Sequence, residues 1–186
     1  MTDAPKNSGN GTDESVEEKI HPYIQQLMNE HQAAMQKIVQ FEVVINEIRE
    51  KGVDQDKANI VNDFFQFFNN NLLVHNEREE KFLFPVLNQK ILQNEGEELY
   101  REKPTAVELL QSDHVGAIQL GAVIFNLFGL AFRLPDPNSR LLTIDLATEQ
   151  ALELVDLLKL HIEREDNIVF PLAQKYIDEA DLNKMG

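Results

Sequence analysis

The sequence His75-Asn-Glu-Arg-Glu-Glu-Lys-Phe-Leu-Phe-Pro85 occurs in a second version as His161-Ile-Glu-Arg-Glu-Asp-Asn-Ile-Val-Phe-Pro171. In each copy a glutamate follows the histidine by four residues, and a Phe-Pro pair ends the motif. Residues four apart lie on the same face of an α-helix. Each copy therefore brings an imidazole and a carboxylate to one point, and two such helices facing each other would form a site for metal.

Helical periodicity continues through most of the chain, and no segment shows the alternation of a β-strand. Short stretches rich in glycine, proline and asparagine divide it into expected helices over about residues 16–51, 56–92, 104–132 and 139–177. Pro85 and Pro171 each lack an amide hydrogen, so we expect a kink or a helix end at both. Four long helices with short connections predict an all-α fold, an antiparallel up-down-up-down four-helix bundle.

The repeat extends beyond the two motifs. Glu30-His31 in the first expected helix resembles Asp113-His114 in the third, and each lies upstream of one motif at a similar distance. The chain therefore has the pattern of two pseudo-symmetric helical hairpins. Folded together, they would bring four histidines and two glutamates into the middle of the bundle.

All four histidines lie on the apolar stripe of their helix, where a bundle places its core. The stripes of the two motif helices are Phe68, Leu72, His75, Glu79 and Phe82, and Leu154, Leu157, Leu158, His161, Glu165 and Ile168. A lone histidine on such a stripe is most often a hydrogen-bonded core residue. Four of them beside two carboxylates indicate metal instead, because a buried unpaired carboxylate is costly unless a cation neutralises it.

The donor types narrow the metal. Imidazole and carboxylate without thiolate suit iron, manganese or zinc, and the chain has no cysteine. A His-Glu-x-x-His sequence is absent, which argues against a zincin, and no Glu-x-x-His precedes the histidines, which argues against a ferritin-like site. The pattern predicts a dinuclear metal centre whose ligands are His31, His75, Glu79, His114, His161 and Glu165.

These residues, with both Phe-Pro tails, resemble the hemerythrin-like (HHE cation-binding) domain family. Its hallmark is His, then His-x3-Glu, then His, then His-x3-Glu on a four-helix bundle. The resemblance covers about residues 20–178 and implies a domain over 16–180 that holds two iron ions with a bridging oxo or hydroxo group. It implies one iron on His31 and His75, the other on His114 and His161, and bridging by Glu79 and Glu165.

One departure from the family bears on function. Oxygen-carrying hemerythrins resemble five-histidine sites, with a further histidine one turn after the first on helix three, where this chain has Ile118. Both irons could then keep an open position, which favours a reactive or sensing centre over oxygen storage. Two functions stay open: a protein that binds or senses oxygen, nitric oxide or iron, or a redox enzyme. Such an enzyme would act on peroxide, nitric oxide or oxygen in stress defence or iron-centre repair.

Composition limits the partners. The chain has 186 residues and a formal net charge of −15, which argues against nucleic acid or an anionic membrane as a partner. The apolar stretch 115–132 is expected to be a buried helix rather than a membrane span. Residues 1–15 are polar and lack the apolar region of a signal peptide, so we expect a disordered tail and a cytoplasmic protein. A small diatomic molecule or peroxide is the expected partner.

Residues beside the predicted ligands have other expected roles. Glu80 and Asp166 directly follow the two glutamates and could support the ligands or replace them. Glu77 and Glu163 lie about 200° round the helix from their histidines and are expected in solvent. Surface positions, in ion pairs for the two arginines, are expected for Arg78, Arg164 and His21.

Two further groups have a packing and a ligand interpretation. Four phenylalanines within 64–68 are expected to pack in the core rather than to form an aromatic box for a ligand. The small residues Gly116, Ala117, Gly121 and Ala122 permit close helix packing, or they leave space for a small ligand near the metals.

Overall fold

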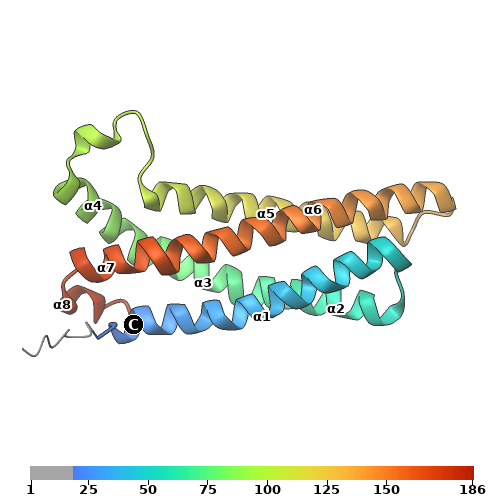
Figure 1. Ribbon diagram of the computed structural model, residues 1–186, viewed down its shortest axis with the longest axis horizontal. Helices are drawn as coiled ribbons and strands as arrows, with labels where there is room; N and C mark the ends of the chain where they lie inside the picture. Colours follow the sequence, from blue (N-terminus) through green and yellow to red (C-terminus); the bar gives the residue numbers. More distant parts are fainter. Residues whose placement is uncertain (1–18) are drawn as a thin grey trace, which may run out of the picture.

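The computed structural model describes residues 19–186, and these are helical without β-strand. The predicted tail, residues 1–15, lies outside the described part of the chain. Long helical segments run side by side along the long axis of the molecule (Figure 1). This arrangement is consistent with the expected four-helix bundle.

Each long segment combines helices in sequence order. The first is α1 (Pro22–Lys51). The second is α2 (Gln55–Phe67), α3 (Leu73–Arg78) and α4 (Phe84–Glu95), joined by the π-helical turns η1 (Phe68–Leu72) and η2 (Glu79–Leu83). The third is α5 (Ala106–Ala131), after a short 3-10 turn, η3 (Glu97–Tyr100). The fourth is α6 (Pro137–Arg164) and α7 (Phe170–Tyr176), joined by the π-helical turn η4 (Glu165–Val169), and a short α8 (Glu179–Leu182) follows.

The first helix starts later than residue 16, because residues 19–21 are not helical. His21 is the N-cap, and its Nδ1 accepts a hydrogen bond from the Tyr23 amide at 3.2 Å. Its Nε2 lies 3.2 Å from Oδ1 of Asn183, so this partly buried ring joins the two ends of the described chain. His21 is therefore at the surface as expected, but it is only partly exposed. Leu182, beyond the expected domain end at 180, is buried in the same core.

Two other helix starts follow from side-chain caps. Thr105 and Glu108 form a capping box, so α5 begins at residue 106 rather than 104. The carboxylate of Asp136 accepts from the Ser139 amide at 2.7 Å, and α6 begins at residue 137 with a proline in its first turn.

Neither proline of the two motifs ends its helix. Instead a π-helical turn precedes each Phe-Pro pair, closed by hydrogen bonds from the Phe84 amide to the Glu79 carbonyl and from the Phe170 amide to the Glu165 carbonyl. A π turn is wider than an α turn and places one extra residue in it. The expected kink or end is therefore a local widening that begins at each predicted glutamate ligand.

The extra residue changes which side chains face the core. Leu83 is 0% exposed and Phe82 46%, and in the other motif Val169 is 1% exposed and Ile168 49%. The apolar stripe drawn with α-helical spacing had placed Phe82 and Ile168 inside, which was wrong. In a π turn the inward position comes one residue later than in an α turn, so it passes to Leu83 and Val169.

The core has two hydrophobic clusters, with the predicted ligands between them along each helix. One contains the phenylalanines of 64–68, among which Phe64 stacks on Phe41 with ring centroids 3.8 Å apart. This confirms their expected role in core packing. The other cluster contains Phe84 and Phe170 of the two Phe-Pro pairs.

The apolar helix α5 is buried on one face only. It is the one described helix long and apolar enough to cross a membrane by length and composition, a test that core helices of soluble proteins also pass. Its inner face carries His114 and packs largely on α6, whereas Phe125 and Ile118 on its outer face are exposed. A Cβ on Gly121 would lie 3.2 Å from the Phe68 ring, so this glycine permits close helix packing.

Candidate metal centre

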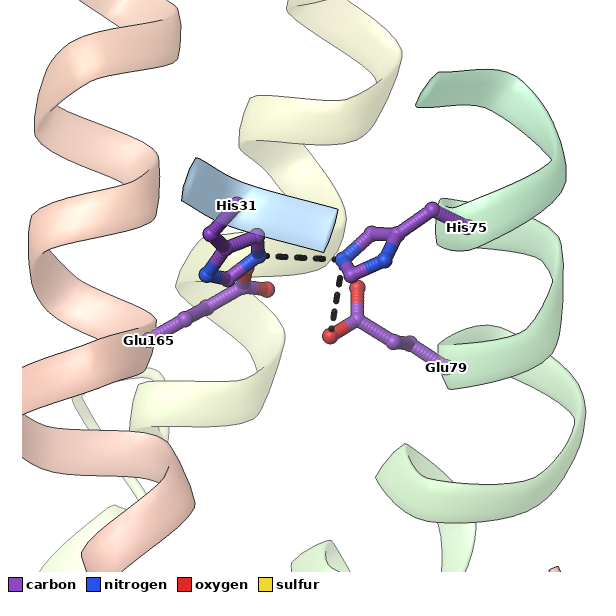
Figure 2. A group of neighbouring side chains, drawn as sticks. All are labelled: His31, His75, Glu79 and Glu165. Atoms are coloured by element: carbon purple, nitrogen blue, oxygen red, sulfur yellow. Dashed lines mark hydrogen bonds and ion pairs between the residues drawn. The ribbon is translucent and has the colours of Figure 1, made fainter. Parts of the chain in front are cut away.

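The structure brings the six predicted ligands into one layer between the two core clusters. Each of the six side chains belongs to a residue that is at most 5% exposed. They come from all four long segments, with Glu79 and Glu165 at the start of their π-helical turns. Figure 2 shows four of the side chains, with His31 and Glu165 facing His75 and Glu79, which lie one turn apart on the same long segment.

The histidines meet in two pairs through their Nε2 atoms. The Nε2 atoms of His31 and His75 are 3.0 Å apart, and those of His114 and His161 are 3.1 Å apart. Two nitrogens bound to one metal at about 2.1 Å would be separated by roughly this distance when the two bonds are near-perpendicular. Each pair, with the two glutamates, forms a group whose ligand atoms all lie within 4.8 Å of one another.

Each glutamate spans both histidine pairs. The two oxygens of Glu79 lie 3.4 Å from Nε2 of His75 and 3.6 Å from Nε2 of His114. The two oxygens of Glu165 lie 3.0 Å from Nε2 of His31 and 3.2 Å from Nε2 of His161. Both carboxylates thus lie where each could bridge two metal ions.

Three histidines are oriented by carboxylates on their outer side. Nδ1 of His31 donates to Asp166 at 2.8 Å, and Nδ1 of His114 donates to Glu80 at 2.9 Å. Because an ionised carboxylate only accepts hydrogen bonds, Nδ1 carries a hydrogen in these rings, and Nε2 is the nitrogen that faces the centre and is left to bind a metal. Glu80 and Asp166 therefore hold predicted histidine ligands from outside, which favours a supporting role for them over replacement of a ligand.

The third outer carboxylate belongs to Glu30, whose Oε2 accepts from Nδ1 of His75 at 2.7 Å. Burial alone would raise the pKa of Glu30, but its hydrogen bonds, above all that from His75, lower it to about 2. No role had been predicted for Glu30 or for Asp113, its counterpart near His161. The signal was present, since an acidic residue directly precedes the first histidine of each expected hairpin.

The Phe-Pro tails also hold histidines. Phe84 stacks on His114 with ring centroids 5.6 Å apart, and Phe170 stacks on His31 at 5.3 Å. Each motif therefore fixes the first histidine of the other expected hairpin, through its phenylalanine and through the acidic residue after its glutamate. This explains why the repeat extends past His-x3-Glu.

The two arginines form the expected ion pairs, in partly buried positions. Arg78 donates to Glu30, and Nη1 of Arg164 donates to Asp113 at 2.9 Å. The other acidic residues of the motifs, at positions 77 and 163, are exposed as expected. The two arginines next to the centre are therefore paired with carboxylates, whereas the glutamates at positions 77 and 163 face solvent, away from the centre.

The two inner carboxylates are poorly satisfied. The oxygens of Glu79 and Glu165 are buried, and no hydrogen bond of regular geometry reaches them. Burial raises the pKa of Glu165, and the charge of Glu79 raises it further. Burial lowers the pKa of His31, but hydrogen bonds to Asp166 and Glu165 outweigh this and raise it to about 9. The layer thus attracts cations, and its donor set fits metal.

Access to this layer is restricted. A cavity of about 350 Å³ touches the outer side of His75 and Arg78, and another of about 460 Å³ touches Asp166 and Phe170. Glu79 and Glu165 line neither cavity. Near His114, the Leu157 side chain comes within 3.4 Å of where a Cβ on Gly116 would be, which favours the packing interpretation of that glycine.

Comparison with known proteins agrees with this donor set. A comparison with curated proteins gives no match. The family model of the hemerythrin HHE cation binding domain matches residues 23–173, a range that includes all six residues of the layer. The protein therefore belongs to the hemerythrin HHE cation-binding domain family.

Proposed function

We propose that this protein is a non-haem di-iron protein that binds or senses oxygen, nitric oxide or iron. The two irons, with a bridging oxo or hydroxo group, would be held by the four histidines and two glutamates of the layer. The observation that carries the proposal is the position of Glu79 and Glu165, each of which lies between both histidine pairs. The proposal includes an antiparallel up-down-up-down bundle of two pseudo-symmetric hairpins.

The protein's own groups would leave room for an external ligand. Each iron would receive two imidazole nitrogens and one oxygen from each carboxylate, fewer donors than an octahedral site accepts. Ile118, at the position of the further histidine in oxygen carriers, is 48% exposed, and the neighbouring buried residue is Ala117. Neither residue adds a donor to the centre.

The surroundings favour small ligands. Iron, when bound, supplies Lewis acidity and one-electron redox chemistry. The protein orients the imidazoles through the outer carboxylates, and the two hydrophobic clusters on either side keep bulk water away. Molecules of the size of oxygen or nitric oxide fit such a closed layer better than an organic substrate does.

Metal analysis and optical spectroscopy test the proposal. After expression in iron-rich medium, we expect about two irons per chain, as in other dinuclear helical-bundle sites, and a near-ultraviolet band from the bridging group. Glu79→Ala and Glu165→Ala should lose most of the iron, whereas Glu77→Ala, an exposed change on the same helix, should retain it. Folded protein without metal after this expression would contradict the proposal.

Mixing the reduced protein with ligands separates binding from catalysis. A single stable adduct with oxygen or nitric oxide supports a binding or sensing protein. Repeated turnover in the presence of a reductant would instead show a redox enzyme, and peroxide should be included as a third reactant.

A further inference from the structure

We infer that the two metal positions of this centre have unequal affinities, and that the position at His31 and His75 binds metal more tightly than the one at His114 and His161. The inference rests on the proposed metal-binding function and adds to it. Its basis is a difference between the two halves of the molecule in how the histidines are held from outside.

Three of the four histidines have a carboxylate on Nδ1, at distances between 2.7 and 2.9 Å. The exception is His161, whose Nδ1 lies 3.8 Å from the nearest oxygen of Asp113. That nitrogen is buried and has no hydrogen-bond partner. Its ring is therefore the one histidine of the layer that no outer hydrogen bond orients.

The cause is one methylene group. Glu30 and Asp113 occupy matching places, each directly before the first histidine of its half. The longer side chain of Glu30 reaches two donors, because its Oε2 accepts from both His75 and Arg78. Asp113 reaches only the arginine, with its Oδ2 at 2.9 Å from Arg164.

The other supports of the two halves match closely. His31 has a carboxylate at 2.8 Å and a stacked phenylalanine at 5.3 Å, and His114 has the same kinds of partner at 2.9 and 5.6 Å. The difference between the halves is thus confined to the positioning residues Glu30 and Asp113. Loss of such an outer hydrogen bond typically lowers metal affinity by about 10- to 100-fold.

Stepwise titration of the metal-free protein tests this. Co²⁺, followed by calorimetry and by its visible absorption, should bind in two steps whose affinities differ by about 10- to 100-fold. Diffraction at the cobalt absorption edge, on crystals with one equivalent of Co²⁺, should locate the metal at His31 and His75. Two steps of equal affinity, or a first metal at His114 and His161, would overturn the inference.

A reciprocal exchange of the two acidic residues identifies the cause. Asp113→Glu should let the carboxylate reach His161 and bring the second step close to the first. Glu30→Asp should weaken the first step by about 10-fold or more. If the longer side chain leaves the second step unchanged in protein that is folded by circular dichroism, the inference fails.

Isosteric variants decide the question if the exchanged variants do not fold. Glu30→Gln should weaken the first step by about 10- to 100-fold, because the carboxylate that orients His75 is lost. Asp113→Asn should change the second step by less than about 3-fold, because Asp113 does not hold His161 in the first place. Equal losses in both variants would overturn the inference. Absence of any Co²⁺ binding in the unmodified protein would instead count against the proposed function.

Discussion

Replacing Glu165 with glutamine should stabilise the metal-free protein and weaken metal binding at the same time. Glu165 is fully buried and its oxygens lack hydrogen-bond donors, while burial and the charge of Glu79 raise its pKa. An acid whose pKa is raised by folding destabilises the folded state wherever it is ionised. Glutamine removes that charge and keeps the shape of the side chain, whose end lies 3.0 Å from Nε2 of His31.

The two effects have estimable sizes. Relief of an unsatisfied buried polar group amounts to about 1–3 kcal/mol, and for a chain of this length each kcal/mol shifts the unfolding midpoint by about 2–4 °C. The metal-free midpoint should therefore rise by roughly 2–12 °C. With metal, a direct ligand is lost, so affinity should fall by more than the roughly 100-fold that loss of an outer partner costs. The stabilisation that bound metal confers falls accordingly.

Thermal unfolding of chelator-treated and metal-loaded protein measures both effects. In Glu165→Gln the unfolding midpoint of the metal-free protein should rise and that of the metal-loaded protein should fall, so the two midpoints should lie closer together. Glu163→Gln, the same change at an exposed position two residues earlier, should leave both midpoints unchanged. A lower metal-free midpoint in Glu165→Gln, with the control unchanged, would refute the view that this carboxylate is an uncompensated charge.

Three further predictions concern protons, register and packing. Carboxylates around His31 and His75 raise the pKa values of these two histidines to about 9 and about 10, so protons compete with metal for their Nε2 atoms near neutral pH. Metal affinity should therefore rise by at least about 10-fold per pH unit from pH 7 to 8; calorimetry that shows no pH dependence would contradict this. In urea unfolding, Leu83→Ala should cost about 2–5 kcal/mol and Phe82→Ala less than about 1 kcal/mol, and the reverse order would show that the π turn is wrongly placed. Gly121→Ala should cost about 1–3 kcal/mol, because its Cβ would crowd a phenylalanine ring. Gly129→Ala, where a Cβ meets nothing, should stabilise by up to about 1 kcal/mol, and equal effects of the two changes would exclude crowding.

Prediction from sequence worked where the signal lies within one helix. The spacing of His75 and Glu79 on one helical face, and their place on an apolar stripe, needed no information about the rest of the chain. The same reasoning failed at Phe82, because it assumed an α-helical turn where the chain forms a π turn. Pro85 indicated that something changes there, but a kink, an end and a widened turn all satisfy a residue without an amide hydrogen.

Prediction also failed where a residue acts across helices. Glu30 lies next to His31 in the chain but orients His75, and Glu80 lies next to Glu79 but orients His114. Adjacent residues on a helix point about 100° apart, so the outer carboxylates necessarily serve histidines of neighbouring helices. Such pairings depend on which helices pack together and at what height.

The sequence by itself determined which side chains would face the interior and what chemistry they offer, because helical periodicity and donor type are local properties. The positions of Glu79 and Glu165 between both histidine pairs, and the missing contact at His161, were decided by tertiary structure alone. They depend on distances of about 3–4 Å between atoms on different helices. A difference of one methylene group becomes decisive at this scale, and only the packing of the whole bundle sets it.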